Sequence, residues 1–188
     1  MPNLNAKLVR SEALTEDVFH YDFEVTEGEL VFKPGQFCML KVDDGDKPVN
    51  RAYSIASLPS SDGKHFSLNI KLVPGGRGSE FLRLKKGGDE MKFMGPFGHF
   101  FLREDEEALK KDIVMVATGT GVAPFMSMLP RLFELGYQGK VTLLFGVRYE
   151  EDMFYLEQLK KWESEHDHFN AILSVSRPKT IGRVTVVG

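Results

Sequence analysis

The 188-residue sequence predicts two domains, a six-stranded antiparallel β-barrel followed by an α/β domain with a parallel sheet. Two observations predict this fold class. The first half contains short strand-like runs separated by turn residues, whereas the second half alternates strand and helix patterns. The charged stretch at residues 103–112 separates the two patterns, so we place the domains at residues 1–104 and 105–188.

The predicted barrel strands are apolar or alternating runs that end at Gly, Asp or Pro. Glycine permits unusual φ angles and proline fixes φ in advance, so these separators are typical of tight turns. Because the separators are short, several hairpins are expected. The runs are residues 6–14, 18–25, 36–42, 51–57, 66–73 and 90–95. A short helix is predicted at residues 80–84.

A strand, a glycine turn and a helix open the predicted α/β domain. The apolar run at 113–117 leads into Thr-Gly-Thr-Gly, and a helical pattern at 122–135 ends before Gly136. Pro130 lies inside this pattern, and we expect it to kink the helix or to end its first segment early. A strand, a helix and a strand are then expected at residues 141–146, 153–162 and 171–175.

Composition excludes several classes of function. The formal net charge of −3 provides no general basic field, so nucleic acid is not an expected partner. The single Cys38 allows neither an internal disulfide nor a four-thiolate iron–sulfur cluster, and the five histidines lack metal-ligand spacing. The start lacks the apolar core of a signal peptide, and the longest apolar run is too short to cross a bilayer. We expect a cytoplasmic protein, and any redox chemistry must come from an organic cofactor.

Three segments carry residues suited to cofactor binding. Arg51-Ala52-Tyr53-Ser54 offers a cation, an aromatic ring and a hydroxyl along one extended segment. Gly75 to Ser79 and Gly119-Thr120-Gly121 each precede a predicted helix, where free N–H groups favour a phosphate. Each segment alone also has a purely structural interpretation, as a surface arginine beside a core tyrosine or as an ordinary glycine turn. Pro124 stands where the standard dinucleotide fingerprint has its third glycine.

Taken together, five motifs resemble the ferredoxin-NADP reductase superfamily in order and spacing. They are RAYS at 51–54, GGRGS at 75–79, GPFGHF at 95–100, ATGTGVAPF at 117–125 and VSR at 175–177. The resemblance implies an FAD-binding barrel and a nucleotide-binding domain, with hydride exchange between the nicotinamide and the flavin. It implies electron transfer to a ferredoxin, a flavodoxin or an oxygenase component. The closest likeness is to bacterial NADP-dependent reductases and oxygenase reductase components.

The resemblance also assigns roles to residues. Arg51 and Ser79 would hold the FAD pyrophosphate, Tyr53 would stack on the flavin, and Ser54 would lie near flavin N5; Tyr53 and Ser54 are therefore the candidate catalytic residues. Thr120 would face both cofactors. The remaining implied FAD contacts are Ala52, the backbone of Ile70, Lys71, Leu72 and Val73, and the loop residues Gly76, Arg77 and Gly78.

The choice of dinucleotide depends on arginines that follow the later strands. Arg148 ends the second predicted α/β strand, Ser176 and Arg177 end the third, and Arg183 follows. Arginine suits a 2′-phosphate, and these arginines match those that bind NADP in the bacterial reductases, so NADP is expected. An alternative is that Glu150, Glu151 and Asp152 pair with Arg148 or take over ribose recognition, which would permit NAD.

Members of the superfamily usually extend further, so we expect a shortened chain with an incomplete nucleotide-binding domain. The strand at 113–117 would then be an open, apolar sheet edge. One hypothesis is a working reductase. A second is a module that binds FAD and the adenosine half of NADP but turns over poorly, because the nicotinamide side of the site is missing. A third is an apoprotein scaffold. The sequence does not predict the oligomeric state.

Overall fold

The computed structural model describes residues 3–179, and these form two compact units. The first unit contains the described residues through Leu102 together with Ala123–Met128. The second contains Arg103–Val122 and the chain from Leu129 onward. Each unit has its own sheet.

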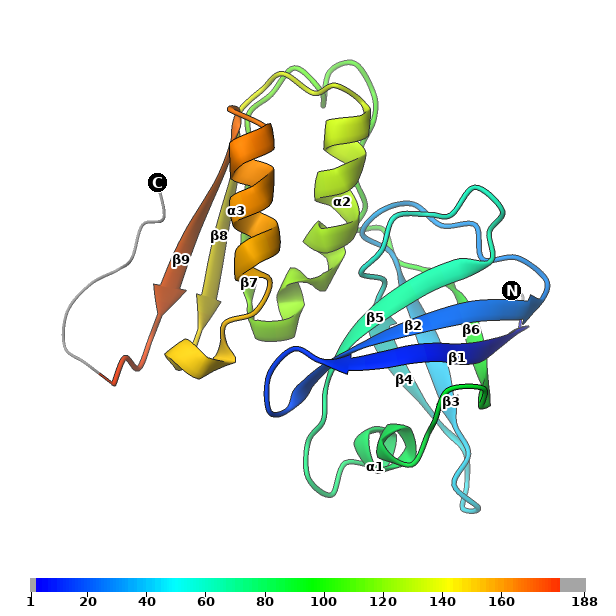
Figure 1. The fold of residues 1–188 in the computed structure, drawn as a ribbon. Helices are drawn as coiled ribbons and strands as arrows, with labels where there is room; N and C mark the ends of the chain where they lie inside the picture. The colour runs from blue at the N-terminus through cyan, green and yellow to red at the C-terminus, as the bar shows by residue number, and fades with distance from the viewer. Residues whose placement is uncertain (1–2, 180–188) are drawn as a thin grey trace. The chain divides into compact units, whose positions relative to one another are not determined.

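The first unit is the six-stranded antiparallel barrel that the alternating runs predict (Figure 1). Its strands lie in the order β4-β3-β6-β1-β2-β5, and one short helix, α1 (Arg77–Arg83), follows β5. The strands are β1 (Asn3–Ala13), β2 (Val18–Glu27), β3 (Phe37–Val42), β4 (Val49–Ser54), β5 (His65–Lys71) and β6 (Glu90–Phe97).

Alternating side chains fill the barrel. In β1, Leu4, Ala6 and Leu8 are buried, and the intervening residues are more exposed, as the two-residue period of a strand requires. Three aromatic rings form the centre of the core. The Phe93 ring meets Phe23 and Phe66 edge-on, with centroids 5.0 and 5.3 Å away.

The second unit contains a parallel three-stranded sheet in the order β7-β8-β9. The chain runs through β7 (Ile113–Thr118), the 3-10 helix η1 (Gly119–Val122), α2 (Ala123–Glu134), β8 (Val141–Val147), η2 (Glu150–Asp152), α3 (Leu156–Glu165) and β9 (Phe169–Val175). This alternation is the predicted α/β pattern. Because the strands are parallel, their carboxyl ends lie along the same edge of the sheet.

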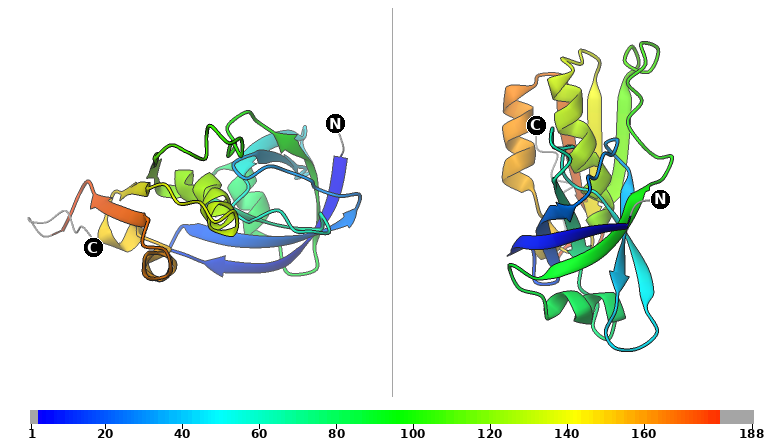
Figure 2. Two further views of the ribbon diagram at one scale, coloured as in Figure 1. Left: turned by 90° about the horizontal axis from the view of Figure 1, so that it is seen from above. Right: turned by 90° about the vertical axis from the view of Figure 1, so that its right-hand side faces the viewer.

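Among the described residues of the second unit, helix covers one face of this sheet (Figure 2). The covered face buries Met115, Leu143 and Phe145, whereas Val114 and Val116 on the opposite face of β7 are 65% and 66% exposed. Within the described residues, β7 has a single neighbouring strand, β8. In the described structure, one face of β7 is therefore exposed, and one of its edges has no strand partner.

Two predicted helix starts differ from the structure, and of the two expectations for Pro130 the early end of the helix is wrong. Helix α1 begins at Arg77, so Ser79 lies in its first turn instead of before it. Helix α2 continues past Pro130 to Glu134, because the fully buried Leu129 and Leu132 stabilise that face against the loss of one backbone hydrogen bond. Helix α3 begins three residues later than predicted, after Tyr155 adopts a left-handed φ of 66°.

The predicted helix terminator, Gly136, follows α2 and has a φ of 64°.

Cys38 is fully buried, and burial raises the pKa of its thiol to about 12. No helix in the described part of the chain is long and apolar enough to cross a membrane.

Candidate functional site

Arg51 and Tyr53 lie on β4, which is an edge strand of the barrel sheet. They pair with Leu40 and Cys38 of β3, so both side chains lie on the same face of the strand, where Tyr53 is half-buried and Arg51 is exposed. Ala52 and Ser54 therefore lie on the other face. The strand thus orients the cation and the ring together, as the spacing of the motif predicts.

Strands β4 and β5 are not neighbours in the sheet, and within the described residues one isolated β-bridge just after β4 connects this part of the chain to β5. A single bridge links Ile55 to Leu68, and the N–H of Ala56 donates to Ser67 O at 2.8 Å. Beyond this bridge, the edge of β5 that faces away from β2 has no strand partner among the described residues. An extended ligand can therefore reach backbone groups along this edge.

The four residues predicted to line the flavin through their backbone have different hydrogen bonds. The N–H of Leu72 donates to Asp17 O at 2.7 Å, and the N–H of Val73 donates to Ser79 Oγ at 2.8 Å. Peptide groups alternate sides along a strand, so those of Lys71 point to the open edge, as those of Ser67 do, whereas those of Ile70 point toward β2. Lys71 is the residue best placed to offer backbone groups.

The start of α1 contacts the Arg51-Tyr53 segment at Gly78. A Cβ atom at Gly78 would lie 2.9 Å from Tyr53 Oη and 3.1 Å from Arg51 Cγ. Glycine therefore allows α1 to approach β4 this closely. Ser79 is buried beside it, and its hydroxyl remains able to donate while it accepts from Val73. The structure thus brings together two motifs that lie more than twenty residues apart in the sequence.

The two arginines of this region have different partners. Arg77 donates through Nε to Asp44 Oδ2 at 3.0 Å and through Nη2 to Asp44 Oδ1 and the carbonyl of Lys47, so it is bound to the β3–β4 hairpin. This contact lowers the pKa of Asp44 to about 2. Arg51 donates only to the carbonyl of Asn50, at 3.1 Å, and forms no ion pair with a described residue. Arg51 is therefore the cation available to an anionic ligand.

The glycine turn of the second unit follows the carboxyl end of β7. Gly119 has a φ of 51°, and a Cβ atom at Gly119 or Gly121 would have no atom within 4 Å. The space above both glycines is therefore open, which suits close approach of a phosphate group. Pro124 lies in the first turn of α2, where its missing N–H removes no helical hydrogen bond. The departure from the standard fingerprint therefore leaves the turn intact.

Arg148 and Arg177 lie side by side at the carboxyl edge of the parallel sheet. The N–H of Ser176 donates to Val147 O at 3.0 Å, and the N–H of Arg177 donates to Arg148 O at 2.8 Å, which extends the β8–β9 pairing past the strand ends. Both arginines are exposed, and neither forms an ion pair with a described residue. Two adjacent cations that lack an acid partner favour an anion at this edge. Arg183 lies outside the described residues.

The alternative pairing of Arg148 with the neighbouring acids does not occur in the described residues. Glu151 instead contacts Lys179 Nζ at 2.7 Å, and Glu150 accepts the backbone N–H of Lys179 at 3.2 Å. Asp152 accepts the N–H of Tyr149 at 3.1 Å. Sequence patterns did not indicate Lys179, because a lysine almost thirty residues from its partners leaves no periodic signal.

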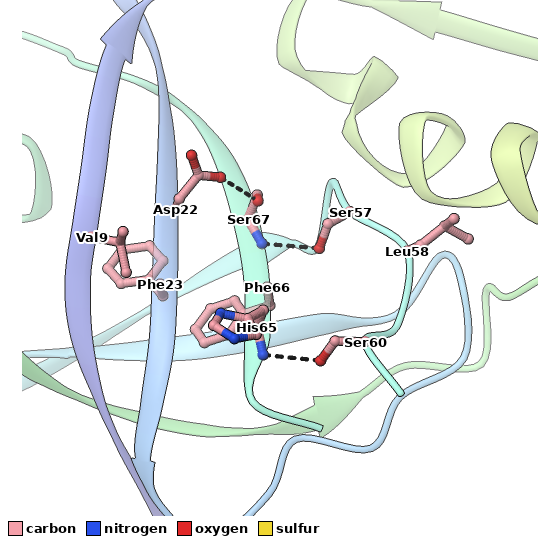
Figure 3. Close-up of a pocket in the computed structure, with 9 residues that line it drawn as sticks. All are labelled: Val9, Asp22, Phe23, Ser57, Leu58, Ser60, His65, Phe66 and Ser67. Carbon is pink, nitrogen blue, oxygen red and sulfur yellow. Dashed lines mark hydrogen bonds between the residues drawn. The ribbon is translucent and has the colours of Figure 1, made fainter. Parts of the chain in front are cut away.

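A cavity of about 300 Å³ elsewhere in the barrel contains none of the predicted cofactor residues (Figure 3). Polar groups that line this cavity form hydrogen bonds with one another. Ser67 Oγ donates to Asp22 at 2.6 Å, and the N–H groups of Ser67 and His65 donate to the hydroxyls of Ser57 and Ser60 at 3.0 Å. These contacts attach the loop after β4 to β5, so we assign this cavity a structural role.

Comparison with known proteins places these features in a family. The model of the oxidoreductase FAD-binding domain matches residues 5–102, and that of the oxidoreductase NAD-binding domain matches residues 115–185. Ferredoxin-NADP reductase B of Sorangium cellulosum is 35% identical over 181 residues, which cover 95% of this chain and 72% of that protein. The electron transfer component of toluate 1,2-dioxygenase from Pseudomonas putida is 36% identical over 80% of this chain, which spans only 43% of that protein.

Solved structures of reductases have the same fold as this chain. The ferredoxin-NADP+ reductase of Plasmodium falciparum with 2′P-AMP aligns with a TM-score of 0.83 and 25% identity, over 97% of this chain and 77% of that one. An Amycolatopsis cytochrome P450 reductase aligns with a TM-score of 0.85 and 25% identity, over 96% of this chain and 54% of that one.

The open-edged barrel is the oxidoreductase FAD-binding domain, and the parallel sheet with its glycine turn is the oxidoreductase NAD-binding domain. The chain belongs to the ferredoxin-NADP reductase superfamily. The predicted cofactors, FAD and NADP, are those of this family. The residues of the chain fit them, since Arg51 beside Gly78 forms no ion pair with a described residue and the space above Gly119 and Gly121 is open.

Proposed function

We propose that this chain transfers hydride between NADPH and FAD and passes electrons to a ferredoxin, a flavodoxin or an oxygenase component. The observation that carries the proposal is the contact of Gly78 with Arg51 and Tyr53, which assembles one cation, one ring and one hydroxyl beside the open edges of the barrel. The names of the relatives support the partner classes, since they include ferredoxin-NADP reductases and dioxygenase electron transfer components.

On the barrel, Arg51 and Ser79 would bind the FAD pyrophosphate, and the Tyr53 ring would stack on the flavin. Stacking suits a half-buried ring, and burial already raises the pKa of Tyr53, which keeps its hydroxyl neutral. Ser54 would lie near flavin N5, and the open edge at Lys71 would supply backbone contacts. Bound FAD would supply the conversion of a two-electron hydride transfer into one-electron transfers. The residues of the chain are therefore needed for binding and orientation.

On the parallel sheet, Gly119, Thr120 and Gly121 would hold the dinucleotide pyrophosphate, and Arg148, Ser176 and Arg177 would bind the 2′-phosphate. Each hydrogen bond to a charged group contributes roughly 1.5 to 3 kcal/mol, so two arginines could favour NADPH over NADH about a hundredfold. Neither Arg148 nor Arg177 forms an ion pair with a described residue, and their backbones are hydrogen-bonded to each other, which supports NADPH as the donor.

A second candidate function is a module that binds FAD and NADP with little turnover. The observation that favours it is the open edge of β7, which has one neighbouring strand within the described residues. In the family, the nicotinamide side of the site lies next to the equivalent strand, so groups needed for hydride transfer would be supplied from outside the residues described.

The two candidates differ in turnover. The protein would be reconstituted with FAD and supplied with NADPH and a small ferredoxin. The rate of cytochrome c reduction would then measure electron transfer. Cytochrome c reduction that requires the protein, FAD and ferredoxin together supports the reductase. FAD binding without NADPH-dependent reduction supports the binding module, and failure to bind FAD contradicts both.

A further inference from the structure

Lys179 holds the acidic residues that lie next to the arginine pair. Its Nζ contacts Glu151 Oε1 at 2.7 Å, and its backbone N–H lies 3.2 and 3.4 Å from the two carboxylate oxygens of Glu150. These contacts join the loop after β9 to η2, which directly follows Arg148 and Tyr149. One lysine therefore contacts both glutamates through different groups.

The acids lie where they would oppose a phosphate. Glu150 and Glu151 are two and three residues from Arg148 in the chain, and the Arg148 carbonyl is bonded to Arg177. Asp152 is already bonded to the backbone of Tyr149. A free carboxylate at this edge would repel a 2′-phosphate, whereas it would accept hydrogen bonds from the ribose hydroxyls of a dinucleotide without that phosphate.

We propose that Lys179 is a specificity-determining positioning residue, which holds Glu150 and Glu151 away from the arginine pair and neutralises them, so that Arg148 and Arg177 can receive a 2′-phosphate. The inference rests on the proposed function, because it assumes that these arginines bind NADP. Lys179 acts through the acids and does not itself contact the ligand. The mutual hydrogen bond lowers the pKa of Glu151 and raises the pKa of Lys179, which keeps both groups charged at neutral pH.

The test uses ligand binding, which does not depend on turnover. Isothermal titration calorimetry would measure 2′,5′-ADP and 5′-AMP binding to the wild-type protein and to Lys179→Met. The substitution removes the Nζ contact with Glu151 but keeps the backbone N–H that donates to Glu150. We expect the affinity for 2′,5′-ADP to fall about fivefold, the scale of one exposed ion pair, while 5′-AMP binding stays constant or improves.

A double variant separates positioning from direct binding. Lys179→Met combined with Glu151→Gln removes the acid along with the lysine, and we expect 2′,5′-ADP binding to return to within about twofold of wild type. If the double variant stays as weak as Lys179→Met, Lys179 contacts the phosphate directly or only stabilises the loop, and the inference is wrong. Lys160→Met is the matched control, since its Nζ contacts Glu157 at 3.2 Å on α3.

The outcomes also distinguish this inference from the proposed function. If the wild-type protein does not prefer 2′,5′-ADP to 5′-AMP, the assignment of NADP to the arginine pair fails. If the wild type prefers 2′,5′-ADP and Lys179→Met keeps that preference unchanged, the arginine assignment stands and the role of Lys179 is wrong.

Discussion

The backbone N–H of Arg177 donates to the carbonyl oxygen of Arg148 at 2.8 Å, so the two arginines leave the carboxyl edge of the parallel sheet as neighbours. They lie twenty-nine residues apart in the sequence and come from different strands. Parallel pairing of β8 with β9 brings them together, because it aligns the carboxyl ends of both strands. The dinucleotide preference that we propose depends on this adjacency.

Replacement of Arg148 or Arg177 by alanine tests that preference. Each variant should lose roughly tenfold or more in NADPH affinity, since a hydrogen bond to a charged group contributes about 1.5 to 3 kcal/mol. The affinity for NADH should change little. Titration of both nucleotides by fluorescence measures this, with Arg103→Ala as the control, since Arg103 is exposed and pairs with Asp105. An equal loss for NADH and NADPH would contradict a role in 2′-phosphate binding.

Gly78→Ala should weaken FAD binding, because the new methyl group would lie 2.9 Å from Tyr53 Oη and displace the ring or α1. Removal of the hydroxyl by Tyr53→Phe in the same chain should restore part of the affinity. Flavin fluorescence quenching measures both variants. Gly87→Ala is the control, since its added Cβ would meet only Val9 O at 3.4 Å. Unchanged FAD binding in Gly78→Ala would place the flavin away from this contact.

Phe93→Ala should strongly destabilise the barrel core. Phe93 is fully buried and its ring meets both Phe23 and Phe66, so truncation should lower the free energy of unfolding by about 3 to 5 kcal/mol. Phe100→Ala should cost much less, because Phe100 is 60% exposed. Denaturant titration of each protein gives the comparison, and equal losses for the two variants would contradict the assigned core.

The Asp44–Arg77 contact should stabilise the protein in a pH-dependent way. Arg77 lowers the pKa of Asp44 from its ordinary value of 3.8 to about 2. A carboxyl whose pKa falls on folding stabilises the native state above its unfolded pKa, and this stabilisation disappears as the pH falls toward the folded pKa. The melting temperature of Asp44→Asn should therefore lie below wild type at neutral pH, and the difference should shrink below about pH 4 and vanish only as the pH falls through about 2.

Thermal melts from neutral pH downward measure this difference. Asp43→Asn serves as the matched control, since Asp43 contacts Lys41 only at 3.8 Å. A deficit in Asp44→Asn that stays constant over the whole acid range would mean that the contact with Arg77 does not shift the titration of Asp44.

Patterns within one segment could be predicted from the sequence, and contacts between distant segments could not. The six barrel strands and the glycine turn follow from local periodicity and turn residues, and the structure has both. The boundaries of α1 and α3 and the continuation of α2 past Pro130 depend on tertiary packing, so they differ from the prediction. The partners of Arg77 are thirty and thirty-three residues away, those of Lys179 are twenty-eight and twenty-nine residues away, and no spacing identifies them.

The most direct test of the central claim is a single-turnover measurement without oxygen. The purified protein would be loaded with FAD, mixed rapidly with NADPH or NADH, and followed by the absorbance of oxidised flavin. We expect bleaching that is much faster with NADPH and is slowed by Arg148→Ala. Bound FAD that stays oxidised with both nucleotides would contradict a reductase and favour the binding module.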